Sequence, residues 1–274
     1  MSRKNFYELL NEMKFDIRSE YHTLYDLFVH EKCCVIGFSM HPLVDYVNDY
    51  FRELPFRGTF INVESMMADM GIIDGHGTLN GLFLFCEFLL AVLPGNKLRD
   101  TSAKKQAVTI VDNITAILEK TNHRLLDKGD SQYIIVEKSK EASQAAELIE
   151  ETSVAIEVLE YNHYALKGNL TRKRQILNDI ANYVEPILKS RKFQGTAYNS
   201  VASNAGFFLN MFHIRHNNKE GAKAQDYIVG LNDSKLEVWY DKIYNVLLSV
   251  IILDKQIDID SELSELKKNY NWKS

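Results

Sequence analysis

Residues 207–219 read Phe207-Phe-Leu-Asn-Met-Phe-His-Ile-Arg-His-Asn-Asn-Lys219, an apolar helical pattern that runs directly into basic and amide side chains. If a helix begins near Tyr198, its apolar residues fall on one stripe at spacings of three and four: Val201, Ala205, Phe208, Leu209 and Phe212. Arg215 follows three residues later, with His216 beside it. A guanidinium directed at a core needs an anionic partner, so we expect either a protein carboxylate or a ligand phosphate beside Arg215.

The composition predicts a mainly helical protein. With 46% hydrophobic and 25% charged residues, the 274-residue chain is typical of a globular protein. Its four prolines and thirteen glycines leave few breaks, which favours long helices over a many-stranded sheet. We therefore predict an all-α fold, a multi-helix bundle with at most one minor strand pair.

Hydrophobic periodicity indicates where the long elements lie. We expect helices at about residues 79–93, 104–126, 141–166, 171–188 and 234–253, and a frayed charged tail after Asp254. The first of these is apolar all round, so it should be central and buried, and it contains the carboxylate of Glu87. The convincing strand signal is Gln132–Glu137, which needs a cryptic partner or packs as an extended segment.

A domain boundary is expected in the polar stretch Asp127–Ser131. It divides the chain into an N-terminal helical domain, 1–130, and a C-terminal helical domain, 131–274. A single continuous globule is the alternative.

Cysteine usage and apolar run lengths indicate the compartment. Cys33, Cys34 and Cys86 form no disulfide framework, which favours a reducing environment. The apolar run Leu82–Leu93 is shorter than the roughly 20 residues of a membrane span, and the start of the chain lacks an apolar signal core. We expect a cytoplasmic protein with no membrane association. His30 beside the cysteines lacks a second ligand pair, so no metal site is predicted, and no motif predicts a cofactor.

The strongest group of candidate site residues surrounds Arg215. An arginine can fork onto two phosphate oxygens, a histidine can donate or accept a proton near neutral pH, and amides complete the shell. Cleavage of RNA needs the same groups. The alternative is structural, in which Arg215 pairs with a buried acid such as Glu87 and the histidines cap helix ends. The residues of this group are Asn210, His213, Arg215, His216, Asn217 and Asn218.

A second basic group precedes it in the chain. Between residues 163 and 178 there is no acidic residue, and Tyr164 lies among the cations, a composition that nucleic-acid binding favours. The formal net charge of −5 opposes an overall grip on nucleic acid but allows a local patch; a solvated helix start is the alternative. The candidate RNA contacts here are His163, Lys167, Arg172, Lys173 and Arg174, to which Lys219 is added from the first stretch.

The segment Ile214-Arg-His-Asn217 resembles the signature of the HEPN superfamily, in which an arginine is followed by a polar residue and then by a histidine several positions later. The flanking Asn210–Asn217 and Trp239-Tyr-Asp-Lys-Ile-Tyr244 are similar to C-terminal regions of bacterial abortive-infection and related phage-defence proteins. The resemblance covers about Tyr161 to Leu253.

The resemblance implies an all-α fold, a homodimer whose arginine loops face a shared cleft, and a role in defence or as a toxin, with a phage or defence-system protein as a further partner. It implies a metal-independent endoribonuclease in which Arg215 stabilises charge, His216 or His213 acts as acid or base, and Asn217 positions the phosphate. The slot of the family's second histidine holds Lys219, Glu220 and Gly221. Two alternatives therefore stay open: cleavage with a substitute histidine, or a non-catalytic module of a phage-defence system that binds RNA or a nucleotide or has a regulatory role.

Overall fold

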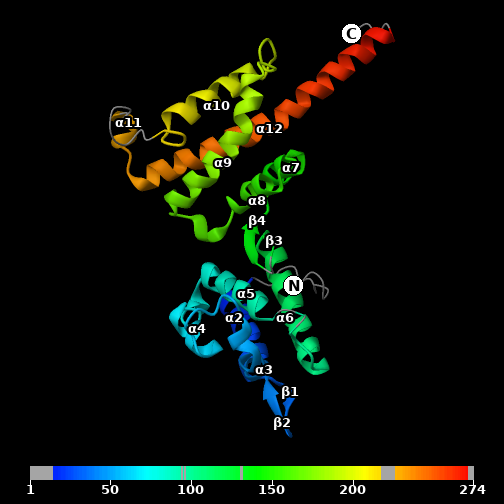
Figure 1. Ribbon diagram of the computed structural model, residues 1–274, viewed down its shortest axis with the longest axis vertical. Helices are drawn as coiled ribbons and strands as arrows, with labels where there is room; N and C mark the ends of the chain where they lie inside the picture. Colours follow the sequence, from blue (N-terminus) through cyan, green and yellow to red (C-terminus); the bar gives the residue numbers. More distant parts are fainter. Residues whose placement is uncertain (1–14, 94, 96, 130–131, 217–225, 271–274) are drawn as a thin grey trace, which may run out of the picture. The chain divides into compact units, whose positions relative to one another are not determined.

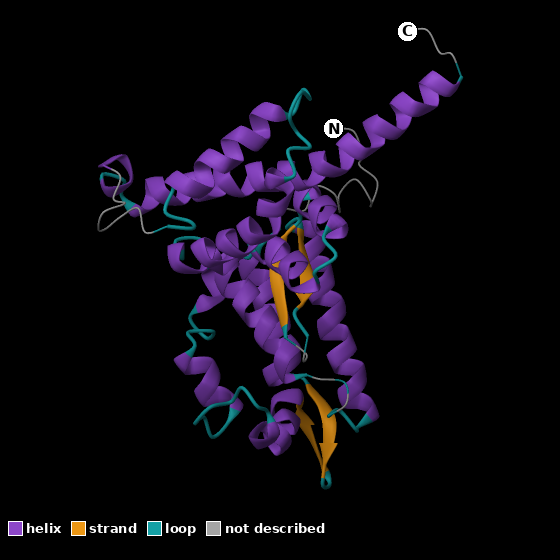
Figure 2. Ribbon diagram, turned by 45° about the horizontal axis from the view of Figure 1, so that its top comes forward, coloured by secondary structure: helices purple, strands orange, loops and turns teal. Residues whose placement is uncertain are grey.

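The computed structural model describes residues 15–93, 95, 97–129, 132–216 and 226–270. They form a mostly α-helical chain, as predicted (Figure 1). The expectation of at most one strand pair is wrong, because this part of the chain contains two antiparallel pairs (Figure 2). The chain divides into two compact units, Met1–Ile135 and Val136–Ser274, so the division falls within a strand five residues after the expected boundary.

The first unit is built from helices and two hairpins, with one helix, α5 (Leu79–Val92), that is apolar all round. Its elements are α2 (Ile17–Tyr25), the π-helical turn η1 (Asp26–His30), β1 (Lys32–Ile36), β2 (Ser39–Pro42), α3 (Leu43–Tyr50), the 3₁₀ turn η2 (Phe51–Glu53), α4 (Val63–Asp69), the 3₁₀ turn η3 (Gly75–Gly77), α5 (Leu79–Val92), α6 (Thr101–Lys120), β3 (His123–Asp127) and β4 (Tyr133–Glu137).

Helix α5 is buried, as its apolar sequence predicts. Thr78 caps its start by accepting a hydrogen bond from the Gly81 amide at 3.0 Å. Tyrosines from neighbouring helices place their hydroxyls on backbone carbonyls of this core, Tyr21 on Ile72 at 2.6 Å and Tyr50 on Val92 at 2.7 Å. Each phenol thus buries its ring while its hydroxyl keeps a partner.

The three cysteines are free thiols of the first unit. Cys34 and Cys86 are fully buried, whereas Cys33 is partly exposed. Burial raises the pKa of the Cys86 thiol far above its ordinary range. Burial also raises the pKa of Cys33 and of Cys34, so all three thiols are expected to be protonated at neutral pH. Cys86 is shielded from reagents as well.

Two hairpins interrupt the helices. The region of ambiguous sequence near residue 37 forms the β1–β2 hairpin, whose turn uses Gly37 at a φ of +62° and leaves Phe38 fully exposed. The second hairpin pairs β4, expected from its sequence, with β3. The predicted helix 104–126 therefore ends early, at Lys120, where Asn122 adopts a left-handed φ of +60°.

The second unit is a helical bundle. After the end of β4 it contains α7 (Lys140–Leu148), α8 (Thr152–Glu160), the 3₁₀ turn η4 (Tyr164–Leu166), α9 (Leu170–Lys189), α10 (Asn199–Met211), α11 (Asp226–Val229) and α12 (Asp233–Asn269). The single helix expected over 141–166 is broken, because Ile149 is extended and turns its side chain into the core.

Helix α12 is longer than predicted. It begins under an Asn232 cap, whose side chain accepts from the Lys235 amide at 2.9 Å. The tail expected to fray after Asp254 is helical to Asn269. Lys192 supports the first part of this extension by pairing with Asp254 and Asp258, each at 2.9 Å.

The core of the second unit lies between α7, α8, α9, α10 and α12. The rings of Tyr161 and Tyr244 stack there, 4.0 Å apart at 11°, and the Tyr244 hydroxyl donates to the Val158 carbonyl at 2.6 Å.

No helix in the described part of the chain has both the length and the apolar character that crossing a membrane requires.

Candidate functional site

A pocket of about 520 Å³ opens in the second unit between α9, α12 and the segment that follows α10. Its lining combines cationic, imidazole and neutral polar side chains with an apolar wall. No Asp or Glu is among the lining residues that the structure describes, which are Leu170, Thr171, Arg174, Gln175, Asn178, His213, Ile214, Arg215, Leu236 and Tyr240. The pocket therefore joins one residue of the second basic group, Arg174, to two of the first.

Helix α9 supplies one wall through a polar stripe. Asn169 caps the helix by accepting from the Arg172 amide at 3.1 Å, which fixes the start of the first turn. From there Thr171, Arg174, Gln175 and Asn178 follow at i, i+3, i+4 and i+7, and so share one face. The neighbouring face of α9 is buried in the core. The helix thus presents one guanidinium, two amides and a hydroxyl to the same space.

The segment after α10 supplies the opposite wall. The helix ends at Met211, four residues before Arg215, so the expectation that it continues to Arg215 is wrong. Phe212 and Ile214 are buried, with the Phe212 ring 4.8 Å from that of Trp239. The residues between and after these two anchors, His213 and Arg215, line the pocket.

His213 has a left-handed backbone, with φ at +56°. Such a conformation is uncommon outside glycine and costs a non-glycine residue about 1 kcal/mol. The anchors on either side hold it, and the Arg174 guanidinium donates from Nε to the His213 carbonyl. Arg174 therefore contributes charge to the pocket and also fixes the turn that carries the imidazole.

Arg215 meets a carboxylate, but not the one suggested by sequence. Its Nη2 donates to Glu185 Oε1 at 2.8 Å, and Lys189 Nζ reaches the same oxygen at 2.8 Å. The hydrogen bond from Lys189 lowers the pKa of Glu185, and Arg215 adds to this effect. Glu87 belongs to the first unit, where it accepts from the Ile135 amide at 2.6 Å. Glu185 thus orients the Arg215 guanidinium from outside the lining.

Tyr240 lines the pocket from α12. It is only 1% exposed, and burial raises the pKa of its phenol to about 12, while the charge of Arg174 acts in the opposite direction. A neutral phenol at this position adds no negative charge to the lining of the pocket.

Other candidates of the first group lie elsewhere. Asn210 is on α10, outside the lining, and its amide donates to the Gly206 carbonyl at 2.8 Å. His216 is half-buried and does not line the pocket. Asn217, Asn218 and Lys219 lie outside the described residues.

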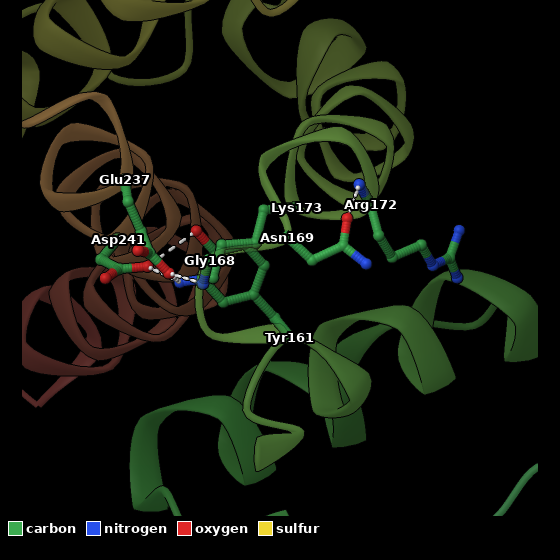
Figure 3. A network of polar contacts seen from close by, with 7 residues as sticks. All are labelled: Tyr161, Gly168, Asn169, Arg172, Lys173, Glu237 and Asp241. Carbon is green, nitrogen blue, oxygen red and sulfur yellow. Dashed lines mark hydrogen bonds and ion pairs between the residues drawn. The ribbon is translucent and has the colours of Figure 1, made fainter. Parts of the chain in front are cut away.

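Lys173, in the second basic group, has partners inside the fold (Figure 3). It is 6% exposed, and its ammonium lies 2.7 Å from Asp241 and 2.9 Å from Glu237. The same ammonium stands 5.2 Å from the centre of the Tyr161 ring. Burial alone would raise the pKa of Glu237, but hydrogen bonds from the Gly168 amide and from Lys173 lower it. Lys173 therefore connects α9 to α12.

Arg172 has carboxylate partners as well. It forks onto Glu160, with Nε–Oε1 at 3.0 Å and Nη2–Oε2 at 2.9 Å. Of the remaining members of the group, His163 packs its ring on Tyr164 and Lys167 is exposed. The basic sequence is thus divided between internal ion pairs and one pocket cation, Arg174.

Sequence reasoning missed Gln175 and Asn178 of the lining, and also Glu185, which pairs with Arg215 from outside it. The available signal was the polar stripe of α9, which occupies the face beside its apolar stripe.

Within the described residues, no group of three or more His, Cys, Asp or Glu side chains is arranged to hold a metal ion. Comparison with protein-family models, with curated proteins and with solved structures finds no match to this chain.

Proposed function

We propose that this chain is a helical phosphate-binding module whose pocket takes a phosphate group of an RNA strand or a nucleotide. One observation carries the proposal: Arg174, Arg215 and His213 line a single pocket with no carboxylate among its described lining residues. Guanidinium groups bind phosphate through paired N–H donors, and the neutral polar side chains of α9 add further donors.

The position of Glu185 is compatible with this role. Its Oε1 accepts a hydrogen bond from Nη2 of Arg215, and this bond keeps the guanidinium in one orientation before a ligand binds. Preorganisation of this kind lowers the entropy lost on binding. The Glu185 carboxylate is shared with Lys189, which reduces its competition with an incoming anion.

Binding is tested by titrating fluorescent single-stranded RNA and a nucleotide into the full chain and into Arg215→Gln. Because a hydrogen bond to a charged group contributes about 1.5–3 kcal/mol, the variant should bind about 10- to 100-fold more weakly. The slope of log affinity against log salt should fall by about 0.7 for each RNA phosphate that the variant no longer neutralises. Arg191→Gln, an exposed arginine of the same unit, is the matched control.

Equal affinities of Arg215→Gln and Arg191→Gln would contradict the proposal, as would a wild-type chain that binds neither ligand. Melting curves of both variants distinguish weaker phosphate binding by a folded chain from a failure to fold.

A second candidate function is metal-independent cleavage of RNA, as the HEPN resemblance implies, within a defence or toxin role. The observation that favours it is His213, a titratable imidazole in the same pocket as two guanidiniums. His213 would take the proton of a ribose 2′-hydroxyl while the 2′-oxygen attacks phosphorus and the P–O5′ bond breaks. A 2′,3′-cyclic phosphate remains, and the leaving 5′-oxygen takes a proton from water to become a hydroxyl. Arg174 and Arg215 would neutralise the charge that builds on the phosphate oxygens.

His213→Asn distinguishes the two functions, since asparagine tolerates the left-handed backbone but cannot act as a base. Cleavage predicts cyclic-phosphate ends with the wild type and intact RNA with this variant, which keeps Arg174 and Arg215 and therefore still binds RNA. It also predicts toxicity on expression that Arg215→Ala relieves. Wild-type binding without cleavage would leave the binding module as the function and refute the nuclease.

A further inference from the structure

The C-terminal end of α12 carries an apolar stripe with no partner among the described residues. Every residue from Ile259 to Tyr270 is exposed, and the red end of the helix extends beyond α9 and α10 of the same unit (Figure 1). Four large apolar side chains in this stretch are 40 to 78% exposed: Ile259, Leu263, Leu266 and Tyr270. Burying these side chains against the surface of a partner would stabilise an assembly.

The spacing of these residues is that of a coiled-coil seam. They follow at intervals of four, three and four, and Ile252 and Gln256 continue the alternation toward the core. In heptad letters, Gln256, Leu263 and Tyr270 occupy a, while Ile252, Ile259 and Leu266 occupy d. A period of 3.5 residues is what two supercoiled helices require, whereas a helix on a globular surface shows a wider stripe.

The charges beside the seam match a second copy of the same helix. Glu262 occupies g and Lys267 occupies the following e, and within the described residues neither takes part in an ion pair of its own chain. In a parallel pair, g of one helix meets the next e of the other, so Glu262 faces Lys267 twice across the dimer. In an antiparallel pair g lies beside g and e beside e, so Glu262 and Lys267 would not face each other.

We propose that the stripe of α12 formed by Ile259, Leu263, Leu266 and Tyr270 joins two copies of this chain in a parallel, in-register coiled coil. The occupant is a second copy because heptad register and e/g charges are both self-complementary. The seam is shorter than the three or four heptads typical of a self-sufficient coiled coil, so the association is weak and depends on protein concentration.

Sedimentation velocity over a range of concentrations tests the association with the full chain. The wild type should shift from monomer to dimer, and Leu263→Gln should remain monomeric, whereas Ser264→Gln, on the outer face next to it, should behave as wild type. A wild type that stays monomeric, or a Leu263→Gln variant that dimerises equally, would overturn the proposal. A stripe that instead covers another part of its own chain would be revealed by a lower melting temperature of Leu263→Gln without any dimer.

Charge reversal tests the pairing. Lys267→Glu alone and Glu262→Lys alone should each dimerise roughly tenfold more weakly, since each places like charges across the seam twice. An equimolar mixture of the two variants should recover the dimer affinity of the wild type, because opposite charges face each other at both positions in the mixed dimer. Lys268→Glu, at the outer f position, is the control for the added charge. Failure of the mixture to recover would contradict the parallel arrangement.

Disulfide trapping tests the register. Leu263→Cys places two thiols opposite each other at a, so oxidation should give a covalent dimer, while Ser261→Cys at the outer f position and the wild type should not. Equal trapping of both variants would mean random collision and would overturn the register.

Discussion

The pairing of Lys173 with two acids of α12 leads to the sharpest prediction for stability. In Lys173→Met the side chain keeps its length but loses the ammonium that stands 2.9 Å from Glu237 and 2.7 Å from Asp241. Removing one partner of a fully buried pair costs about 3–5 kcal/mol, because the other charge is left desolvated. Here the acids are more exposed than the lysine, with the Glu237 and Asp241 side chains 18% and 49% exposed, so part of this cost is recovered by hydration.

We therefore expect the free energy of unfolding of the second unit to fall by about 2–3 kcal/mol, equivalent to roughly 8 °C in melting temperature. Urea denaturation followed by tryptophan fluorescence measures it, because both tryptophans of the chain, Trp239 and Trp272, belong to this unit. Lys189→Met is the control, being the same substitution on the same helix at an exposed ion pair, and should change the free energy by less than about 0.5 kcal/mol. The triple variant Lys173→Met, Glu237→Gln, Asp241→Asn should regain most of the loss. If Lys173→Met is no less stable than Lys189→Met, the internal ion pairs do not hold α9 to α12.

Three further predictions concern single side chains of the second unit. Burial, aided by Asp179, raises the pKa of Glu157 to about 7, so folding favours the protonated form and the free energy of unfolding should fall as pH rises from about 4.5 to 7. Glu157→Gln should remove this pH dependence and add about 1 kcal/mol at pH 8 after allowance for solvent screening, whereas an unchanged pH profile would refute the prediction. His213→Val should destabilise by about 1–2 kcal/mol because β-branched residues resist its left-handed backbone, while His213→Asn should change the unfolding free energy little; equal melting curves would argue against a strained turn. Tyr244→Phe should lower the free energy of unfolding by about 1–2 kcal/mol, because the Val158 carbonyl and the Asn162 side-chain amide each lose their hydrogen bond to the phenol. Tyr198→Phe, which removes an exposed hydrogen bond of 3.3 Å, is the control in the same urea assay.

Sequence periodicity predicted most helices because burial of an apolar stripe is a local pattern. Helices α5 and α9 lie where their stripes place them, and Pro186 falls in the last turn of α9, as a helix can tolerate. The breaks were harder to predict. The stop at Lys120 depends on pairing of β3 with β4, and the gap between α7 and α8 depends on packing of Ile149, both of which are tertiary effects.

The candidate site was predicted in part for the same reason. His213 and Arg215 were found because polar residues continue an apolar pattern, and Arg174 because it lies in a basic run. A linear pattern does not say which cations of the run face inward, so Arg172 and Lys173 were grouped with Arg174 although carboxylates elsewhere in the chain bind them. Glu185 lies 30 residues before Arg215, and only the fold brings the two together.

The free thiols of this chain allow one unit to be observed separately from the other. All three cysteines belong to the first unit, and Cys86 is sealed in its core, so an aromatic disulfide reagent can reach it only when that unit opens. The labelling rate of Cys86 under native conditions should therefore report the opening free energy of the first unit, while circular dichroism follows both units together. The native chain thus contains its own probe for the opening of the first unit, and no engineered label is needed.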